Sequence, residues 1–140
     1  MPEVKEKSGK KFIYSEIVED HFFNPRNMLK EGKETEFEAI GEIGSPACGD
    51  VMKVYLKIKK NKITEFKWKT FGCASAIAAT SILSEMSIGL NIDDAYRITA
   101  NDITEALGGL PKRKIHCSVL GDQALRVAID NYKKSLPKKS

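Results

Sequence analysis

The sequence predicts an α+β fold in which a small three-stranded antiparallel sheet is packed by helices on one face. Strand patterns fill much of the first half of the chain, whereas helical patterns fill the second half. No apolar run approaches the roughly 18–20 residues that span a bilayer. The chain has 140 residues, of which 41% are hydrophobic and 30% are charged. This composition is typical of one folded domain and excludes a disordered chain or a membrane bundle.

The strands are predicted from residues that alternate between apolar and polar. A first strand region runs from Phe37 to Ile43, and the alternation is clearest after Val51. One face of that second strand carries Met52, Val54, Leu56 and Ile58, and the other carries Lys53, Tyr55, Lys57 and Lys59. A polar turn at 60–62 leads to a third alternating segment at 63–71, with Phe66 and Trp68 as core residues. The second and third strands are therefore predicted to form a hairpin.

The helices are predicted from caps, breakers and apolar spacing. Ser15 is expected to cap a short helix that Asn24-Pro25 ends, with Ile17, Val18 and Phe22 on one face. The later helices are predicted at 74–88 (mostly buried), 93–98, 102–107 and 117–134 (amphipathic). We therefore expect a flexible tail at 1–11, a single domain at 12–135 and a flexible tail at 136–140.

The charge distribution and the number of cysteines indicate which classes of partner and which cellular compartment to expect. Lys and Arg number 23 against 19 Asp and Glu, and much of the net charge of +4 lies at the two ends of the chain. This pattern predicts neither a nucleic-acid partner nor a membrane partner. The first eleven residues contain Glu3 and Glu6 and no apolar stretch, so they do not resemble a secretory signal. An odd number of cysteines, three, favours the reducing cytoplasm.

All three cysteines fall where predicted elements begin. Cys48 enters a strand, Cys73 begins the buried helix and Cys117 begins the last helix. Partial positive charge at a helix N-terminus favours the thiolate, the form that binds metal or attacks sulfur. Asp50 and His116 lie within two residues of a cysteine, and each is a candidate fourth ligand, proton acceptor or gate. This donor set suits zinc or an iron–sulfur centre, and the residues alone leave permanent and transient binding open.

Other interpretations of the same residues stay open. The cysteines could hold zinc permanently in a structural or adaptor domain. A thiol enzyme could use Cys117 with His116 as its base, although adjacent residues that begin a helix rarely point at each other. The basic run Lys112-Arg113-Lys114 is either a solvated loop or a docking point for an acidic or peptide-binding partner.

Five motifs in order carry a family resemblance. They are Tyr14-Ser15-Glu16 with Asp20-His21-Phe22, Asn24-Pro25-Arg26-Asn27, Pro46-Ala47-Cys48-Gly49-Asp50, the run from Lys69 to Ala78, and the run from Lys114 to Leu120. Together they closely resemble the IscU family of iron–sulfur cluster assembly scaffolds, which includes the N-terminal domain of NifU. The resemblance covers about residues 13 to 133 and implies an IscU/SufE-like fold.

The resemblance implies roles for individual residues. Cys48, Cys73 and Cys117 match the three cysteine ligands of a 2Fe–2S cluster, and Asp50 or His116 would complete the set. Cys117 matches the acceptor of persulfide sulfur. Asp50 matches a residue whose loss makes the cluster longer-lived, and its hard carboxylate is a poor partner for a soft centre. The resemblance also places Lys114 beside His116, where it would assist ligand exchange.

The resemblance also implies partners. Sulfur would come from an IscS/NifS-type cysteine desulfurase, iron from an unidentified donor and electrons from a candidate donor such as ferredoxin. The cluster would then pass to apo iron–sulfur proteins such as ferredoxin, so the protein is expected to be a scaffold and not an enzyme. Family members also hold zinc in the same pocket. Leu110-Pro111-Lys112-Arg113-Lys114 differs at two positions from the motif of members that use a dedicated chaperone pair, which leaves that step open.

Overall fold

The computed structural model describes residues 3–5, 11–13, 15–30, 32–33, 36–37, 39–45, 50–72, 74–110 and 116–135. Only the backbone is described for 3–5, 11–13, 45, 50, 116–120 and 135; elsewhere in these ranges the side chains are described as well. Its strands are β1 (Glu3–Lys5), β2 (Lys11–Ile13), β3 (Ala39–Ser45), β4 (Asp50–Lys59) and β5 (Lys62–Phe71). Its helices are α1 (Glu16–Phe23), α2 (Ala74–Ser87), α3 (Ile92–Tyr96), α4 (Ala100–Ala106) and α5 (His116–Ser135).

The main sheet has the order β3-β4-β5, and both neighbouring pairs are antiparallel. The predicted hairpin is confirmed: β4 and β5 are joined by Lys60 and Asn61, whose φ angles of 51° and 62° lie in the left-handed region that tight turns use. A bulge in the pairing falls between Lys57 and Ile58. The predicted three-stranded antiparallel sheet is therefore present.

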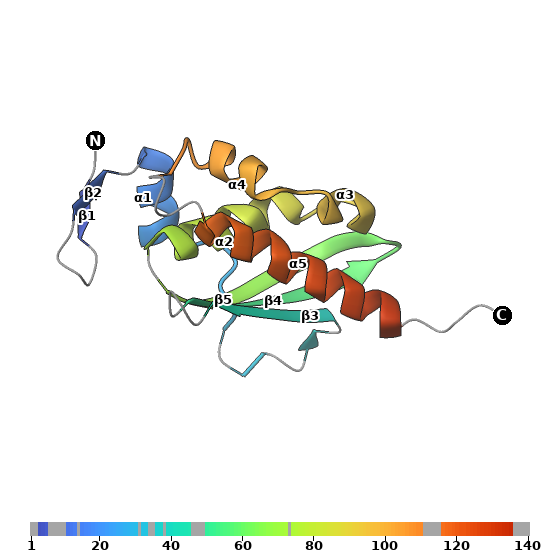
Figure 1. Cartoon of the computed structure of the whole chain (residues 1–140). Coiled ribbons are helices and arrows are strands. Elements are labelled where there is room, and N and C mark those ends of the chain that lie inside the picture. The colour runs from blue at the N-terminus through green and yellow to red at the C-terminus, as the bar shows by residue number, and fades with distance from the viewer. Residues whose placement is uncertain are drawn as a thin grey trace.

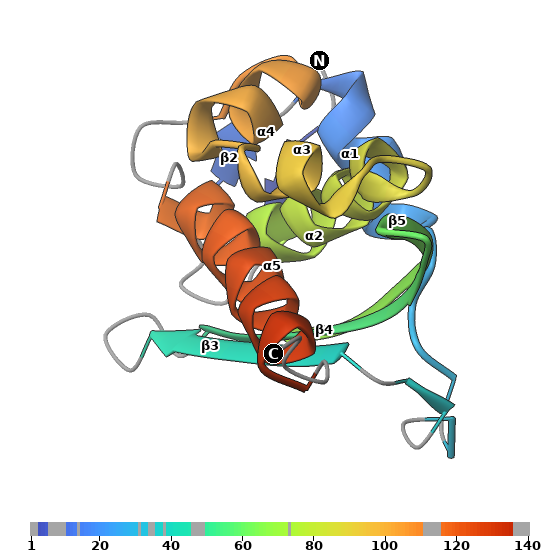
Figure 2. The ribbon, with the colours of Figure 1, turned by 90° about the vertical axis from the view of Figure 1, so that its right-hand side faces the viewer.

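Helices cover one face of this sheet, as predicted. Figure 1 shows α2 and α5 lying along the sheet, and Figure 2 shows α1, α3 and α4 beyond them. The core between sheet and helices includes the fully buried Met52, Val54, Leu56, Phe66 and Trp68. The sheet and α5 approach each other closely at Gly41 in β3, where an added Cβ atom would lie 2.3 Å from the carbonyl oxygen of Ala124 in α5. Only a residue without a side chain lets the helix pack this closely.

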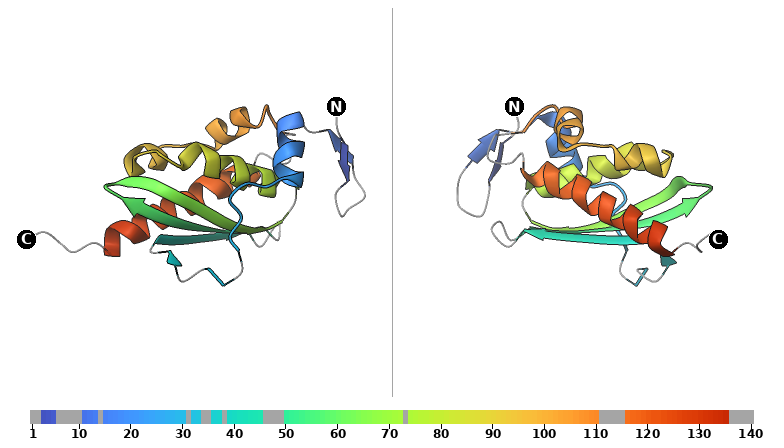
Figure 3. Two further views of the ribbon diagram at one scale, coloured as in Figure 1. Left: turned by 180° about the vertical axis from the view of Figure 1, so that it is seen from behind. Right: turned by 45° about the vertical axis from the view of Figure 1, so that its right-hand side comes forward.

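The opposite face of the sheet has a small core of its own. Tyr55 projects to the side away from the helices, yet it is only 4% exposed because Leu29 and Phe37 pack with it. The Phe37 and Tyr55 rings meet edge to face with centroids 5.9 Å apart. The chain between α1 and β3 passes across this face, as Figure 3 shows for its described parts. No sequence pattern had indicated that cover.

The first helix confirms its predicted cap and corrects its predicted face. The Ser15 side chain accepts a hydrogen bond from the backbone N–H of Val18, 3.1 Å away. Val18 is fully buried, but Ile17 is 43% exposed and the second buried residue of α1 is His21. The expectation that Ile17 belongs to the buried face is therefore wrong, because α2 packs against the side of α1 that carries Val18 and His21.

The remaining helices match their predictions to within a few residues. Asn91 caps α3, and Thr99 caps α4 through a reciprocal capping box with Asp102. The last helix begins one residue earlier than predicted, so His116 is its first residue rather than the one before it. The Arg126 guanidinium donates to the carbonyl oxygens of Tyr96 and Ile98, which fastens the α3–α4 connection to α5.

Of the two predicted tails, only the N-terminal one contains residues that the structure describes. Residues 1–11 were predicted to be a loose tail, whereas β1 pairs with β2 in antiparallel register. The second predicted tail, 136–140, lies outside the described residues. Within the part of the chain that is described, no helix is both long and apolar enough to cross a membrane.

Candidate functional site

The first predicted ligand segment joins β3 to β4. Ser45, the last residue of β3, is the register partner of Asp50, the first residue of β4. The connection between them carries Cys48, which lies outside the described residues, as does the side chain of Asp50. This connection therefore leaves and rejoins the sheet at one end.

The second segment joins β5 to α2 at the same end. Phe71, the last residue of β5, pairs with Val51 near the start of β4. Gly72 follows and α2 begins at Ala74, so the connection is very short; Cys73 itself lies outside the described residues. The residue that follows the Cys48 connection, Asp50, and the residue that pairs with Phe71, Val51, are therefore consecutive in β4. The connections that contain Cys48 and Cys73 thus begin or end on neighbouring strands at the same end of the sheet.

The third segment is the first turn of α5. The Asn131 side chain donates to the carbonyl oxygen of Ile40 at 2.7 Å, while Gly41 faces Ala124 and Ala128. The helix therefore runs antiparallel to β3, and its first turn extends about 12 Å beyond Ala124 toward the Ser45 end. Figures 1 and 3 show α5 beginning at that end of the sheet.

The predicted ligands on α5 can be placed by backbone alone. His116 and Cys117 are its first two residues, and their side chains lie outside the described ones, as does all of Lys114. Among the side chains that are described, no group of three or more His, Cys, Asp or Glu residues is placed to hold a metal ion. The ligand set thus remains a prediction, and the finding is that the described residues flanking Cys48 and Cys73 lie at the same end of the sheet as the start of α5.

The two helices that begin at this end differ electrostatically from the others. Glu16 and Glu19 lie in the first turn of α1, Asp93 and Asp94 in that of α3, and Asp102 in that of α4. By contrast, α2 and α5 have no acidic residue in their first turns. No acidic residue within those first turns offsets the partial positive charge of these two helix N-termini.

Two threonine hydroxyl groups, one of them buried, fasten the start of α2 to the sheet. The Thr70 hydroxyl donates to the Thr80 hydroxyl at 3.0 Å, and Thr80 donates to the carbonyl oxygen of Ala76 at 2.8 Å. Thr70 precedes Cys73 by three residues, so these bonds set the position from which the chain enters α2. The predicted buried helix is confirmed, with small polar residues on its hidden faces.

A second polar network joins α1 to α2 and to the sheet. Nδ1 of His21 lies 2.7 Å from the Ser81 hydroxyl, which also accepts from the backbone N–H of Arg26 at 2.9 Å. The Arg26 carbonyl in turn accepts from Nε1 of Trp68 at 2.6 Å. Burial, aided by the Arg26 charge, lowers the pKa of His21, although Glu85 at 3.3 Å acts in the other direction. The motif residues His21 and Arg26 had no predicted role, and only the family motif singled them out.

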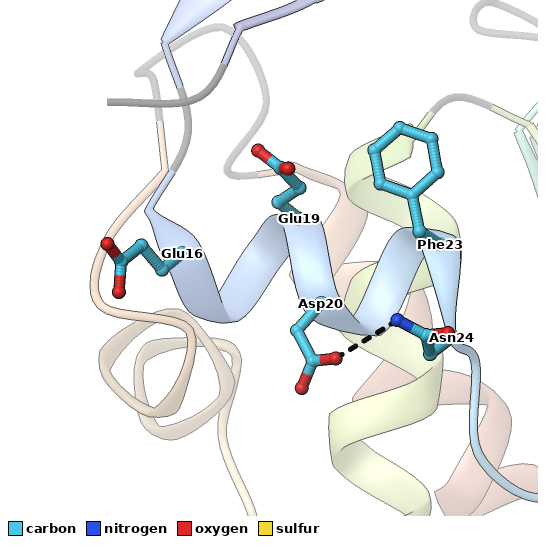
Figure 4. Close-up of a pocket in the computed structure, with 5 residues that line it drawn as sticks. All are labelled: Glu16, Glu19, Asp20, Phe23 and Asn24. Atoms are coloured by element: carbon cyan, nitrogen blue, oxygen red, sulfur yellow. Dashed lines mark hydrogen bonds between the residues drawn. The ribbon is translucent and has the colours of Figure 1, made fainter.

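An open pocket of about 500 Å³ runs along the outer side of α1 (Figure 4). Its lining consists of Glu16, Glu19, Asp20, Phe23 and Asn24. The Arg26 guanidinium bonds the Asp20 carboxylate at 2.5 Å and holds the pKa of Asp20 below its ordinary value.

Comparison with known proteins decides the family. The model of the NifU-like N-terminal domain matches residues 13–139 of this chain. The chain belongs to the NifU-like N-terminal domain family. The resemblance inferred from the sequence motifs is therefore confirmed.

Similar proteins within and near this family carry consistent names. "Iron-sulfur cluster assembly scaffold protein IscU 1" of Archaeoglobus fulgidus is 50% identical over 120 residues, which cover 86% of this chain and 76% of that protein. "Iron-sulfur cluster assembly scaffold protein IscU" of Aquifex aeolicus is 47% identical over 123 residues, which again cover 86% of this chain and 76% of that protein. "Nitrogen fixation protein NifU" of Nostoc sp. is 43% identical over 125 residues, covering 86% of this chain but 42% of that longer protein.

Solved structures support the fold. A NifU-like N-terminal protein from Brucella abortus superposes with a TM-score of 0.65 at 19% identity, covering 87% of this chain and 95% of that one. A candidate cluster assembly scaffold of the SUF system from Fervidobacterium islandicum gives a TM-score of 0.64 at 21% identity, covering 83% and 96%. At these identities the likeness concerns the fold alone.

Proposed function

We propose that this protein is a scaffold on which a transient 2Fe–2S cluster is assembled and then transferred to apo-proteins. The observation that supports the proposal is that the described residues flanking Cys48 and Cys73, and the start of α5, whose second residue is Cys117, lie at one end of the sheet. The names of the family relatives point to the same role.

The donor set suits a cluster that is held and later released. Three thiolates are soft ligands for iron–sulfur centres, and two of them belong to helix starts that favour the charged form. Asp50 or His116 would supply the fourth ligand. A carboxylate is a harder ligand than a thiolate, so Asp50 would hold this centre less firmly. In this account Asp50 acts as the gate for release.

Sulfur arrives at Cys117 in the proposed sequence of events. The Cys117 thiolate attacks the terminal sulfur of a persulfide on a cysteine desulfurase, so an S–S bond forms on Cys117 and the desulfurase recovers its thiolate. Two electrons then cleave the S–S bond of each persulfide, which releases sulfide and restores the cysteine thiolate; reduced ferredoxin, which gives one electron per molecule, is the proposed donor. Lys114 would assist the exchange of ligands beside His116.

The cluster is cargo, so the protein acts as a sulfur acceptor and scaffold rather than as an enzyme. Recipient proteins would be apo iron–sulfur proteins such as ferredoxin, in the reducing cytoplasm, where thiols persist. The same donor set would also bind zinc, which shares the preference for thiolate and imidazole ligands.

Anaerobic reconstitution tests this proposal. The protein is mixed with iron, cysteine and a cysteine desulfurase, and the visible absorption is followed before and after apo-ferredoxin is added. We expect a 2Fe–2S spectrum to form on the scaffold and then move to the ferredoxin. A colourless protein that keeps one zinc ion per chain would instead support a structural zinc domain.

A further inference from the structure

A hydrogen bond joins the start of α1 to the end of α4. The Ser15 hydroxyl, which accepts the backbone N–H of Val18 as the cap of α1, also donates to the carbonyl oxygen of Leu107, 92 positions away. Leu107 directly follows α4, and the last carbonyl groups of a helix find no partner within it. One hydroxyl group therefore completes the hydrogen bonding at the ends of two helices.

The chain packs tightly where these two helices meet. Gly108 has a φ of 79°, and a Cβ atom added to it would lie 3.2 Å from Cβ and 3.3 Å from Oγ of Ser15. Gly89 has a similar φ of 92°, but no described atom lies within 4 Å of the Cβ position there. A side chain would strain the backbone at both glycines, whereas only at Gly108 would it also press on Ser15. We name Ser15, Leu107 and Gly108 the α1–α4 joint.

The other end of α4 is fastened to α5. The Arg126 guanidinium donates to the carbonyl oxygen of Ile98 at 2.7 Å, directly before Thr99, the cap of α4. Between the two ends of α4, the fully buried Ile103 packs over Gly121 of α5, where its Cδ1 would lie 3.6 Å from an added Cβ atom. Figures 1 and 2 show α4 beside α1 and over the first half of α5. Contacts at both ends thus hold α4 where it packs on α5.

The contact at Gly121 lies one helical turn from the predicted sulfur acceptor. Cys117 precedes Gly121 by four residues, so the two positions share one side of α5. We propose that Ser15 is a positioning residue for sulfur transfer to Cys117, an inference that rests on the proposed scaffold function. By holding Leu107, Ser15 keeps α4 packed against α5, and this packing fixes the place of the first turn of α5.

Two substitutions of the same size separate this role from the capping of α1. Asn, Asp and Ser cap helices about equally well, because each side chain offers an oxygen to a backbone N–H. The amide group of Asn can also donate to the carbonyl oxygen of Leu107, whereas an ionised Asp carboxylate only accepts. Ser15→Asn therefore keeps both hydrogen bonds. Ser15→Asp keeps the cap and loses the bond to Leu107.

Amide hydrogen exchange of the metal-free protein tests whether Ser15 positions α5. In Ser15→Asp we expect the amides of residues 116–124 to exchange about fivefold faster than in the parent, the magnitude of one lost hydrogen bond. The amides of residues 125–135, which lie beyond the contact with Ile103, should exchange as in the parent. Ser15→Asn should stay within about twofold of the parent throughout α5.

Sulfur transfer from a cysteine desulfurase is the second readout. Intact mass after rapid quenching gives the rate at which sulfur appears on each variant over a series of desulfurase concentrations. Ser15→Asp should lower the maximal rate about fivefold and leave the half-saturating desulfurase concentration within about twofold, because the acceptor is misplaced while the binding of the desulfurase is unchanged. Ser15→Asn should keep the maximal rate of the parent.

The glycines provide an independent pair of variants. Gly108→Ala should reproduce both effects of Ser15→Asp, because the new Cβ presses on Ser15 from the other side of the joint. Gly89→Ala carries a similar backbone strain without that contact, so it should lower stability and keep the exchange of 116–124 and the maximal rate of the parent.

The results that would overturn the proposal are distinct from those that concern the proposed function. Equal behaviour of Ser15→Asp and Ser15→Asn, faster exchange spread evenly over the chain in Ser15→Asp, or equal sulfur-transfer rates in Gly108→Ala and Gly89→Ala would overturn it. A parent protein that takes up no sulfur would contradict the proposed function, while hydrogen exchange would still decide whether Ser15 positions the start of α5.

Discussion

Nδ1 of His21 lies 2.7 Å from the hydroxyl oxygen of Ser81, and this contact joins α1 to α2 in the interior. The same hydroxyl accepts the backbone N–H of Arg26, so one small buried side chain serves two partners. Because α2 begins directly after Cys73, the contact links a motif near the N-terminus to the helix that begins at the candidate site.

Replacing Ser81 with alanine should lower the stability of the fold. The change leaves the His21 ring nitrogen and the Arg26 amide without their hydrogen-bond partner, and each unsatisfied buried group costs about 1–3 kcal/mol. We therefore expect the free energy of unfolding in urea to fall by about 2–3 kcal/mol. Thr64→Ala is the control, because its exposed hydroxyl bonds only one carbonyl, and it should cost less than about 0.5 kcal/mol. Similar losses in both variants would contradict this role for Ser81.

Stability should decrease as the solution becomes acidic. The pKa of His21 is lowered in the folded protein from its ordinary value of 6.5, mainly by burial. The unfolded chain therefore binds this proton first, and the free energy of unfolding falls as the pH falls below about 6.5. Urea unfolding midpoints between pH 7.5 and pH 5 measure the slope. His21→Gln should lose most of it, whereas His116→Gln, which keeps His21, should retain it; an unchanged slope in His21→Gln would refute the assignment.

Gly41→Ala should disturb the seating of α5 on the sheet. An added Cβ would lie 2.3 Å from the Ala124 carbonyl oxygen and 2.4 Å from the Ala128 nitrogen, both of which are backbone atoms. The helix must move, and we expect a loss of at least about 2 kcal/mol in the free energy of unfolding. Gly121→Ala is the matched control on α5, since its Cβ would meet only Leu83 and Ile103 side chains at 3.4 and 3.6 Å. That variant should be neutral or up to about 1 kcal/mol more stable.

Asp50→Ala should keep the cluster and transfer it slowly. Asp50 begins β4, and we assign its carboxylate to the release of the cluster. Without this hard ligand, transfer to apo-ferredoxin should be about tenfold slower, which corresponds to about 1.4 kcal/mol in the barrier. Circular dichroism of the cluster in the visible range separates scaffold-bound from ferredoxin-bound forms. Equal transfer rates in Asp50→Ala and the parent would exclude the gating role.

Cys117→Ser should prevent sulfur from appearing on the scaffold. A serine hydroxyl is a much weaker nucleophile toward a persulfide than the thiolate that a helix N-terminus favours. Intact mass measured after incubation with desulfurase and cysteine should show an added sulfur atom on the parent, on Cys48→Ser and on Cys73→Ser. Persulfide that persists at Cys48 or Cys73 in the Cys117→Ser variant would move the acceptor role to that residue.

The sheet could be predicted because its pattern is local. Met52, Val54, Leu56 and Ile58 alternate with polar residues, and a period of two specifies both the strand and its buried face. The predicted inward face and the hairpin were therefore confirmed. Tyr55 was correctly assigned to the outward face, but its burial depends on Leu29 and Phe37, which approach from a connection without any periodic pattern.

The short first helix shows where local patterns fail. In eight residues, apolar spacing cannot separate Ile17 from Val18 as the buried residue, and a histidine is not expected in a core. His21 is buried because Ser81 on α2 supplies a partner, a contact between residues sixty positions apart. Only the tertiary structure reveals it.

The candidate site was predictable in its parts and not in its assembly. The three cysteines fall at the starts of elements in the sequence, but spacing alone could not bring them together. The register of Ser45 with Asp50 and of Val51 with Phe71, together with the antiparallel run of α5 over β3, places the described residues next to these cysteines at one end of the sheet. The roles of Cys48, Asp50, Cys73, His116 and Cys117 remain our proposal.

The central claim is that the protein hands an assembled cluster directly to a recipient, and transfer in the presence of a competing chelator tests it most directly. The cluster-loaded protein is mixed anaerobically with apo-ferredoxin and an excess of a strong iron chelator, and both products are followed by their spectra. Direct transfer predicts that ferredoxin gains its 2Fe–2S spectrum at the same rate with and without the chelator. Capture of all the iron by the chelator, with no cluster on the ferredoxin, would contradict the account.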